Sequence, residues 1–175
     1  MSNKEKLHEI AKALVMPHKG ILAADQSPRT MNKQLEALGL QPEAELRRKY
    51  RQLLFSTPGL EEYVTGVILH DGTIRNHDDN GTQFSDLLIA KGVIPIIKVD
   101  KSTIAHTGFE GEVVTQGLDG LGERLQEYYD MGARAAKWRS VFTISDTTPT
   151  EQNILFDCVT LARYAALCQE AGIVP

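Results

Sequence analysis

The chain has 175 residues and a formal net charge of −4 at pH 7, and 42% of its residues are hydrophobic, which suits one globular domain with a buried core. Its longest basic run is Arg47-Arg48-Lys49, which argues against nucleic acid as a partner. No apolar run reaches the roughly 18 residues of a membrane span, and residues 1–4 lack the apolar core of a signal peptide. We therefore expect a cytoplasmic protein with no membrane partner.

Four short apolar runs alternate with helical patterns along the chain. The first helix is predicted over residues 4–15, with Leu7, Ile10, Leu14 and Val15 on one face. The predicted strands cover residues 20–24, 64–69, 93–97 and 133–138. The later predicted helices cover residues 30–38, 42–55, 83–90, 118–131 and 148–171.

Proline and capping residues indicate where two of these helices begin. Pro42 is expected in the first turn of its helix. The last helix is expected to open with a capping box over 148–151 that has Pro149 at the first helical position. That helix ends before Gly172, a typical residue just beyond a helix.

Two segments are predicted to be loops, and a further strand is predicted after the last helix. Residues 72–82 are polar and contain the turn signal Asn80-Gly81, and residues 102–117 are rich in Gly and Thr. Residues 173–175 resemble the first residues of a fifth buried strand. We expect residues 1–175 to be one half of a single domain, truncated at the start of that strand.

The fold class follows from the repeat of strand and helix. The strands are apolar runs without alternation, which is typical of parallel strands covered by helices. The sequence therefore predicts an α/β fold of the (β/α)8 TIM-barrel type, of which four units form about one half.

The two cysteines are expected to be free thiols. Cys158 and Cys168 lie on one predicted helix, where their separation of about 15 Å exceeds the roughly 7 Å that a disulfide tolerates. Free thiols accord with a reducing cytosol.

Four ionisable residues lie at the ends of predicted strands, where barrels of this type carry their active sites: Asp25, Lys98, Lys137 and Arg139. Lys137 and Arg139 are two positions apart, so both should point to one side of their strand. Such a cationic cluster beside one carboxylate predicts an anionic substrate, most simply a phosphorylated metabolite, and a lysine there could transfer protons or attack a carbonyl. A set of salt bridges that closes the top of a barrel is the structural alternative.

No known cofactor or metal motif is present. The sequence lacks a dinucleotide fingerprint, a P-loop and a G-x-S-x-G turn. Its five histidines show no paired metal spacing, and we expect His77-Asp78-Asp79 to be a solvated loop. We predict no cofactor and no metal.

Taken together, seven strings resemble class I fructose-1,6-bisphosphate aldolases, the metal-independent Schiff-base type. In order, they are KGILAADQS (19–27), YRQLLFST (50–57), GVILH (66–70), IKVDK (97–101), VTQGLDGLGER (114–124), AKWR (136–139) and LARYAALCQEAGIVP (161–175). The resemblance implies a homotetramer that reversibly cleaves fructose 1,6-bisphosphate into dihydroxyacetone phosphate and glyceraldehyde 3-phosphate in glycolysis and gluconeogenesis. The enzyme would be a lyase.

The resemblance also implies roles for individual residues. Asp25 would orient the lysines and act on the substrate C4 hydroxyl, and Lys137 would stabilise charge and transfer protons. Lys98 would bind substrate oxygens or the C6 phosphate, and Arg139 would bind substrate and hold the network of lysines and carboxylate. Ser27 and Thr30 match hydroxyls on the phosphate side; Asp119 matches a residue near the subunit contact, with a helix N-cap as the plain alternative.

The chain departs from the family pattern on the phosphate side. Gln26 stands where an acidic residue is usual, and Pro28-Arg29 replaces a small, Gly-containing turn. In the family, the glutamates of the fifth strand, the Schiff-base lysine of the sixth and a further phosphate site of the last strands lie beyond the segment that this chain matches.

We therefore expect negligible aldolase activity from this chain alone. Two interpretations stay open: part of a normal aldolase, and a non-catalytic half barrel that binds a phosphorylated ligand or pairs with an aldolase subunit. A transaldolase-like barrel is a third, less favoured option.

Overall fold

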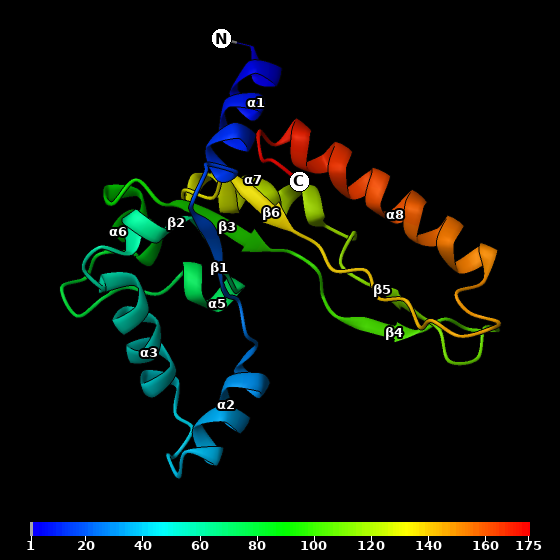
Figure 1. Cartoon of the computed structure of the whole chain (residues 1–175), viewed down its shortest axis with the longest axis horizontal. Helices are drawn as coiled ribbons and strands as arrows, with labels where there is room; N and C mark the ends of the chain where they lie inside the picture. Colours follow the sequence, from blue (N-terminus) through cyan, green and yellow to red (C-terminus); the bar gives the residue numbers. More distant parts are fainter. Residues whose placement is uncertain (1) are drawn as a thin grey trace.

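The computed structural model describes residues 2–175 and has a parallel sheet at its centre, with helices packed around it (Figure 1). The sheet contains four strands in the order β1-β2-β3-β6. Their bounds are β1 Gly20–Ala24, β2 Val64–Leu69, β3 Ile94–Lys98 and β6 Ala135–Lys137. The prediction of an α/β fold with parallel strands is confirmed.

The centre of the sheet is apolar on both faces, which is why its strands could be recognised as continuous apolar runs. Leu69 and Ile97, which lie on one face, are completely buried, and Ile96 on the other face is 4% exposed. In the register of β3 and β6, Ile97 pairs with Ala136 and Lys98 pairs with Lys137. The register therefore places the two lysines side by side at the same end of the sheet.

Most of the predicted helices are confirmed within a few residues. The helices within residues 2–175 are α1 Asn3–Leu14, α2 Pro28–Ala37, α3 Ala44–Ser56, α4 Leu60–Tyr63, α5 Asp71–Ile74, α6 Phe84–Ala90, α7 Leu121–Asp130 and α8 Glu151–Glu170. The sequence did not predict α4 or α5, each of which is a single turn.

Three predicted helix starts are wrong. Pro42 precedes α3, whose N-cap is Glu43. Asp119 is not an N-cap, because α7 begins after Gly120, which has a φ of 64°. The last helix begins at Glu151 with Thr150 as its N-cap, so the capping box and the helical Pro149 are not present.

The predicted loop 102–117 contains a small antiparallel hairpin. Its strands are β4 Thr103–Ala105 and β5 Val113–Thr115. Glu112, which is 2% exposed, accepts hydrogen bonds from the N–H and the hydroxyl of Thr150, at 2.8 and 2.6 Å. The hairpin is therefore fastened to the start of α8 (Figure 1).

Helix α1 has no buried residue. Of the four apolar residues on its predicted face, Val15 is exposed, while Leu14 reaches the position over Gly66 in β2. The hydroxyl of Thr65 donates to the carbonyl of Leu14 at 2.7 Å, which fixes the end of the helix against the sheet.

The predicted fifth strand is confirmed in its first residues. Val174 forms a parallel bridge with Ala135, donates to the carbonyl of Arg134 at 2.9 Å and accepts from the N–H of Ala136 at 2.8 Å. Ile173 beside it is completely buried. These residues continue the hydrogen-bonding pattern of the sheet beyond β6.

The expectation of free thiols is also confirmed: both cysteines are unpaired, Cys158 exposed and Cys168 buried. None of the helices within residues 2–175 combines the length and the apolar character needed to cross a bilayer.

Candidate functional site

Polar side chains gather at the carboxyl end of the parallel sheet. Asp25 and His70 directly follow β1 and β2, whereas Lys98 and Lys137 are the last residues of β3 and β6. Because the strands are parallel, all four residues lie at one edge of the sheet. The structure therefore brings three of the four predicted strand-end residues, Asp25, Lys98 and Lys137, to this edge, together with His70.

Asp25 and Lys137 form an ion pair, with 2.7 Å between Oδ2 and Nζ. Their strands, β1 and β6, are the two outer strands of the sheet. With neighbouring strands about 4.8 Å apart, these two would stand roughly 14 Å apart in a flat sheet. The ion pair therefore crosses the ends of the two inner strands and holds the lysine over the carboxyl edge.

Lys98 is paired with a different carboxylate, Asp100. Its Nζ lies 2.8 Å from Oδ1 of Asp100 and donates to the carbonyl of the same residue at 3.0 Å. The strand-end pattern predicts only Asp25 near the lysines, and Asp100 was not predicted, although it follows Lys98 by two positions in the string IKVDK. The two lysines thus have separate anionic partners.

Ser27 and Thr30 form the start of α2. The Ser27 hydroxyl accepts from the N–H of Thr30 at 3.3 Å and lies 3.1 Å from its hydroxyl. Ser27 also lines a cavity with Lys98, whereas Thr30 does not. The predicted phosphate-side hydroxyls are adjacent, but only Ser27 lies in the same cavity as the lysine.

That cavity, which we call the Lys98 pocket, has a volume of about 490 Å³. All but one of its lining residues are polar, charged or aromatic with a hydroxyl; they are Ser27, His70, Asp71, Arg75, Lys98, Val99, Asp100, Lys101, Ser102, Arg124 and Tyr128. Arg75 is already paired with Asp71 at 2.9 Å, and Arg124 donates to two backbone carbonyls. Lys101 has no ion pair within residues 2–175.

Arg139 does not join this network. The strand β6 ends at Lys137, so Arg139 lies beyond the ladder, and its side chain is exposed without an ion pair to any residue from 2 to 175. Its backbone carbonyl accepts from the Thr115 hydroxyl at 2.6 Å. The expectation that it would share a side with Lys137 assumed a longer strand.

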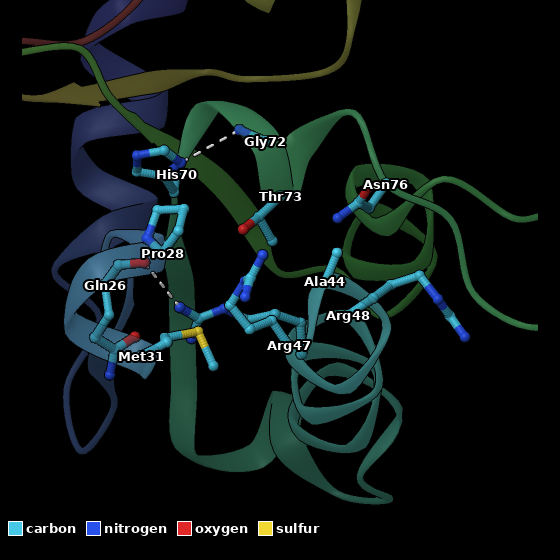
Figure 2. Close-up of a pocket in the computed structure, with 11 residues that line it drawn as sticks. Gln26, Pro28, Met31, Ala44, Arg47, Arg48, His70, Gly72, Thr73 and Asn76 are labelled. Carbon is cyan, nitrogen blue, oxygen red and sulfur yellow. Dashed lines mark hydrogen bonds between the residues drawn. The ribbon is translucent and has the colours of Figure 1, made fainter. Parts of the chain in front are cut away.

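His70 lines both the Lys98 pocket and a second cavity, whose residues are drawn in Figure 2. Burial, and then the positive charge of Lys98, lower the pKa of its imidazole below the usual value of 6.5. Its Nδ1 accepts from the N–H of Gly72 at 3.3 Å. A neutral ring in this arrangement carries its proton on Nε2.

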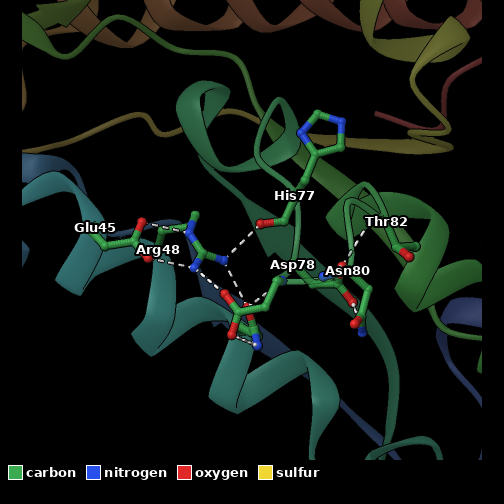
Figure 3. Close-up of polar contacts among 8 residues, drawn as sticks. Glu45, Arg48, His77, Asp78, Asn80 and Thr82 are labelled. Atoms are coloured by element: carbon green, nitrogen blue, oxygen red, sulfur yellow. Dashed lines mark hydrogen bonds and ion pairs between the residues drawn. The ribbon is translucent and has the colours of Figure 1, made fainter.

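The loop around His77 is ordered by polar contacts (Figure 3). Arg48 donates to the His77 carbonyl at 3.0 Å and is also paired with Asp79 and Glu45. Asp78 accepts from two N–H groups of its own turn, those of Asn80 and Thr82. Over residues 2–175 no three His, Cys, Asp or Glu side chains are grouped to hold a metal ion.

This arrangement can bind anions and move protons. The Lys98 pocket offers ammonium and guanidinium groups to an anionic ligand, and the pair of Lys137 and Asp25 provides an acid and a base in contact. The structure brings together four of the predicted site residues, Asp25, Ser27, Lys98 and Lys137. Thr30 contacts Ser27 outside the pocket, and Arg139 is exposed beyond the end of β6.

Comparison with known proteins gives a consistent result. Residues 6–175 match the family model described as fructose-bisphosphate aldolase class-I. A protein of Xanthomonas axonopodis named "Probable fructose-bisphosphate aldolase class 1" is 49% identical over 171 residues, which are 98% of this chain and 51% of that protein. Fructose-bisphosphate aldolase 7, cytosolic, of Arabidopsis thaliana is 45% identical over 98% of this chain and 48% of its own length.

A solved structure has the same fold. A fructose-bisphosphate aldolase from Plasmodium falciparum, crystallised in complex with TRAP and a small-molecule inhibitor, aligns with a TM-score of 0.95 and 42% identity. The alignment covers 99% of this chain and 50% of that chain. The chain thus spans about half the length of the relatives it matches.

Proposed function

Because the chain belongs to the class-I fructose-bisphosphate aldolase family, we propose that the protein it forms part of reversibly cleaves fructose 1,6-bisphosphate. The C3–C4 bond of the ketose breaks and its electron pair stays on C3. The C4 hydroxyl loses its proton and becomes the aldehyde of glyceraldehyde 3-phosphate, and C3 takes up a proton to give dihydroxyacetone phosphate. The family resemblance assigns the Schiff-base lysine to a sixth strand, and the sheet of this chain has four strands. Within residues 1–175 we therefore propose positioning and proton transfer, without the covalent step.

The observation that carries this proposal is the ion pair of Lys137 and Asp25 beside Lys98. Within the proposed reaction, Asp25 acts on the C4 hydroxyl, and its contact with Lys137 allows the pair to exchange a proton. Lys137 also stabilises negative charge that develops near the reacting carbons.

Substrate phosphate is proposed to bind in the Lys98 pocket. Lys98 is 21% exposed while its partner Asp100 is fully buried, so the ammonium is the accessible member of the pair. Ser27 supplies a hydroxyl in the same pocket. Thr30 and Arg139 are proposed as further residues that contact the substrate once it is bound.

Two measurements test the proposal. The 175-residue chain is incubated with dihydroxyacetone phosphate and borohydride, and its intact mass is measured. We expect no adduct, because the nucleophile is proposed to lie outside this chain. An adduct on Lys98 or Lys137 would overturn the assignment of roles.

The second measurement supplies the missing half. The Xanthomonas relative is 49% identical to this chain, so its unmatched half is mixed with the chain and cleavage of fructose 1,6-bisphosphate is followed. We expect activity with the natural chain and none with Lys137→Met, with Lys12→Met, an exposed lysine on α1, as the matched control. Ligand binding without cleavage in any mixture would favour a non-catalytic binding module instead.

We further propose a homo-oligomer that works in the cytoplasm. A tetramer is the form that the family resemblance implies, and α8 carries exposed apolar side chains that could lie in an interface, among them Leu155 and Val159. The word "cytosolic" in the name of the Arabidopsis relative and the two free thiols support the location. Sedimentation of the protein tests the first proposal, and fractionation of cells tests the second.

A further inference from the structure

A second cavity of about 220 Å³, which we call the Arg51 cavity, lies between α2, α3 and α5 (Figure 2). Its lining includes arginines and a histidine but no aspartate or glutamate; the residues are Gln26, Pro28, Met31, Ala44, Arg47, Arg48, Arg51, His70, Gly72, Thr73 and Asn76. His70 is the one residue that it shares with the Lys98 pocket. The proposed catalytic residues lie outside its lining.

Arg51 is the unusual member of this lining. It is only 2% exposed, and its guanidinium donates a single hydrogen bond, from Nη2 to the carbonyl of Gln26 at 3.3 Å. Its Nε and Nη1 are buried with no partner among residues 2–175. Its Cζ lies 5.7 Å from the centre of the Tyr50 ring.

A buried guanidinium without a counter-ion is costly. Burial lowers the pKa of Arg51, but an arginine stays charged at any physiological pH. A water molecule can accept hydrogen bonds from the free N–H groups, yet it supplies no negative charge. The space beside the Arg51 guanidinium therefore favours the binding of an anion.

The other donors of the cavity are arranged around the same space. Arg48 is neutralised by Glu45 and Asp79, so it adds little net charge. Arg47 has no ion pair within the described residues and donates only to Asn32, at 2.8 Å. The side chains of Thr73 and Asn76 face the same region and make no hydrogen bond of their own among residues 2–175 (Figure 2).

We propose that the Arg51 cavity binds a small tetrahedral oxyanion of the phosphate class, either as the free ion or as the phosphoryl group of a metabolite. Two unpaired arginines and two neutral donors suit the several acceptor oxygens of a phosphate, and the planar fork of a guanidinium binds such oxygens in pairs. The site is distinct from the Lys98 pocket and does not depend on the proposed aldol reaction.

The test uses the whole 175-residue chain, labelled with 15N arginine. Inorganic phosphate is titrated at constant ionic strength with chloride as the reference anion, while calorimetry gives affinity and stoichiometry and NMR follows the Nε–H signal of Arg51. We expect that signal to move with phosphate and not with chloride. Glucose 6-phosphate in a second titration distinguishes a phosphomonoester from the free ion.

Variants assign each bound phosphate to its cavity. Arg51→Lys keeps the charge but loses the fork, and we expect about tenfold weaker binding at this site, as for loss of a charge-assisted hydrogen bond. Thr73→Val removes one donor without changing charge and should weaken binding in the same direction. Arg163→Met, on the exposed side of α8, is the matched control and should bind like the natural chain.

The two proposals fail in different ways. Lys98→Met should remove phosphate only from the Lys98 pocket and leave the Arg51 signal responsive. The Arg51 proposal is overturned if Lys98→Met abolishes all binding, if Arg51→Lys and Thr73→Val bind as tightly as the natural chain, or if phosphate and chloride act alike. Loss of binding only in Arg51→Lys and Thr73→Val would support this site and count against a phosphate at Lys98.

Discussion

The ammonium of Lys137 lies 2.7 Å from the carboxylate of Asp25, and this contact joins the first and last strands of the four-stranded sheet. Asp25 is 11% exposed and Lys137 is 36% exposed, so the pair is only partly shielded from water. Partly exposed ion pairs contribute modestly to stability, which makes the pair more important for positioning than for folding.

A double-mutant cycle measures that contribution. For Asp25→Asn and Lys137→Met we expect a coupling free energy of about 1 kcal/mol in urea unfolding. The matched cycle pairs Asp25→Asn with Lys33→Met, an exposed lysine on α2 that has no ion pair within residues 2–175. Equal coupling in the two cycles would show that the contact is not formed in solution.

The carboxylate of Glu112 should make stability depend on pH. Burial alone would raise its pKa, but hydrogen bonds from Thr150 and the charge of His106 hold the pKa below its ordinary value of 4.5. A carboxyl whose pKa is lower in the folded state stabilises the protein above its unfolded pKa, and this stabilisation is lost as the pH falls through the folded value.

The variant Glu112→Gln should therefore have a lower unfolding midpoint than the natural chain at pH 7. The difference should shrink as the pH falls below about 4.5, because the natural residue then also becomes neutral. Glu110→Gln, at an exposed position in the same hairpin turn, serves as the control. A difference that is constant from pH 7 to pH 3 would contradict the argument.

The two cysteines should react very differently. Burial raises the pKa of the Cys168 thiol to about 12, whereas Cys158 is exposed. Since the thiolate is the reactive form, Ellman's reagent at pH 8 should modify one thiol in the folded chain and two in denaturant. Cys158→Ser should leave no fast-reacting thiol, and a fast reaction in that variant would mean that α8 opens readily.

Gly66 should tolerate no side chain. A Cβ there would lie 2.9 Å from Cδ1 of Ile96, 3.0 Å from the carbonyl of Ile94 and 3.0 Å from Cδ2 of Leu14. We expect Gly66→Ala to lower the free energy of unfolding by about 2 kcal/mol, as for other overpacked cores. Gly20→Ala, where nothing lies within 4 Å, is the matched control and should be nearly neutral. Equal effects of the two substitutions would show that the space over Gly66 is not filled in solution.

The sequence predicted the parallel sheet well because buried strands leave continuous apolar runs. The bounds of β1 and β2 agree residue for residue with the predicted ranges. The strands β4 and β5 were missed because three residues each are too few to show a period. The hairpin that they form is fastened to the rest of the chain by a contact between Glu112 and Thr150, 38 positions apart, which no local pattern reveals.

The candidate site was predictable in its members and less so in its pairings. Parallel strands bring their carboxyl ends to one edge, so Lys98 and Lys137 had to be neighbours. That Asp25 reaches Lys137 across the whole sheet depends on how the sheet curves. The isolation of Arg51 depends on which groups fold around it, although Gln26 in place of an acidic residue was a signal in the sequence.

Three consecutive residues before α2 each serve a different part of the molecule. Asp25 contacts Lys137, the carbonyl of Gln26 accepts from Arg51, and Ser27 caps the helix while lining the Lys98 pocket. A tilt of α2 would thus alter the proton-transfer pair, the buried arginine and the wall of the pocket in one movement. A ligand that binds at one of these three residues would therefore also restrict the motion of the other two.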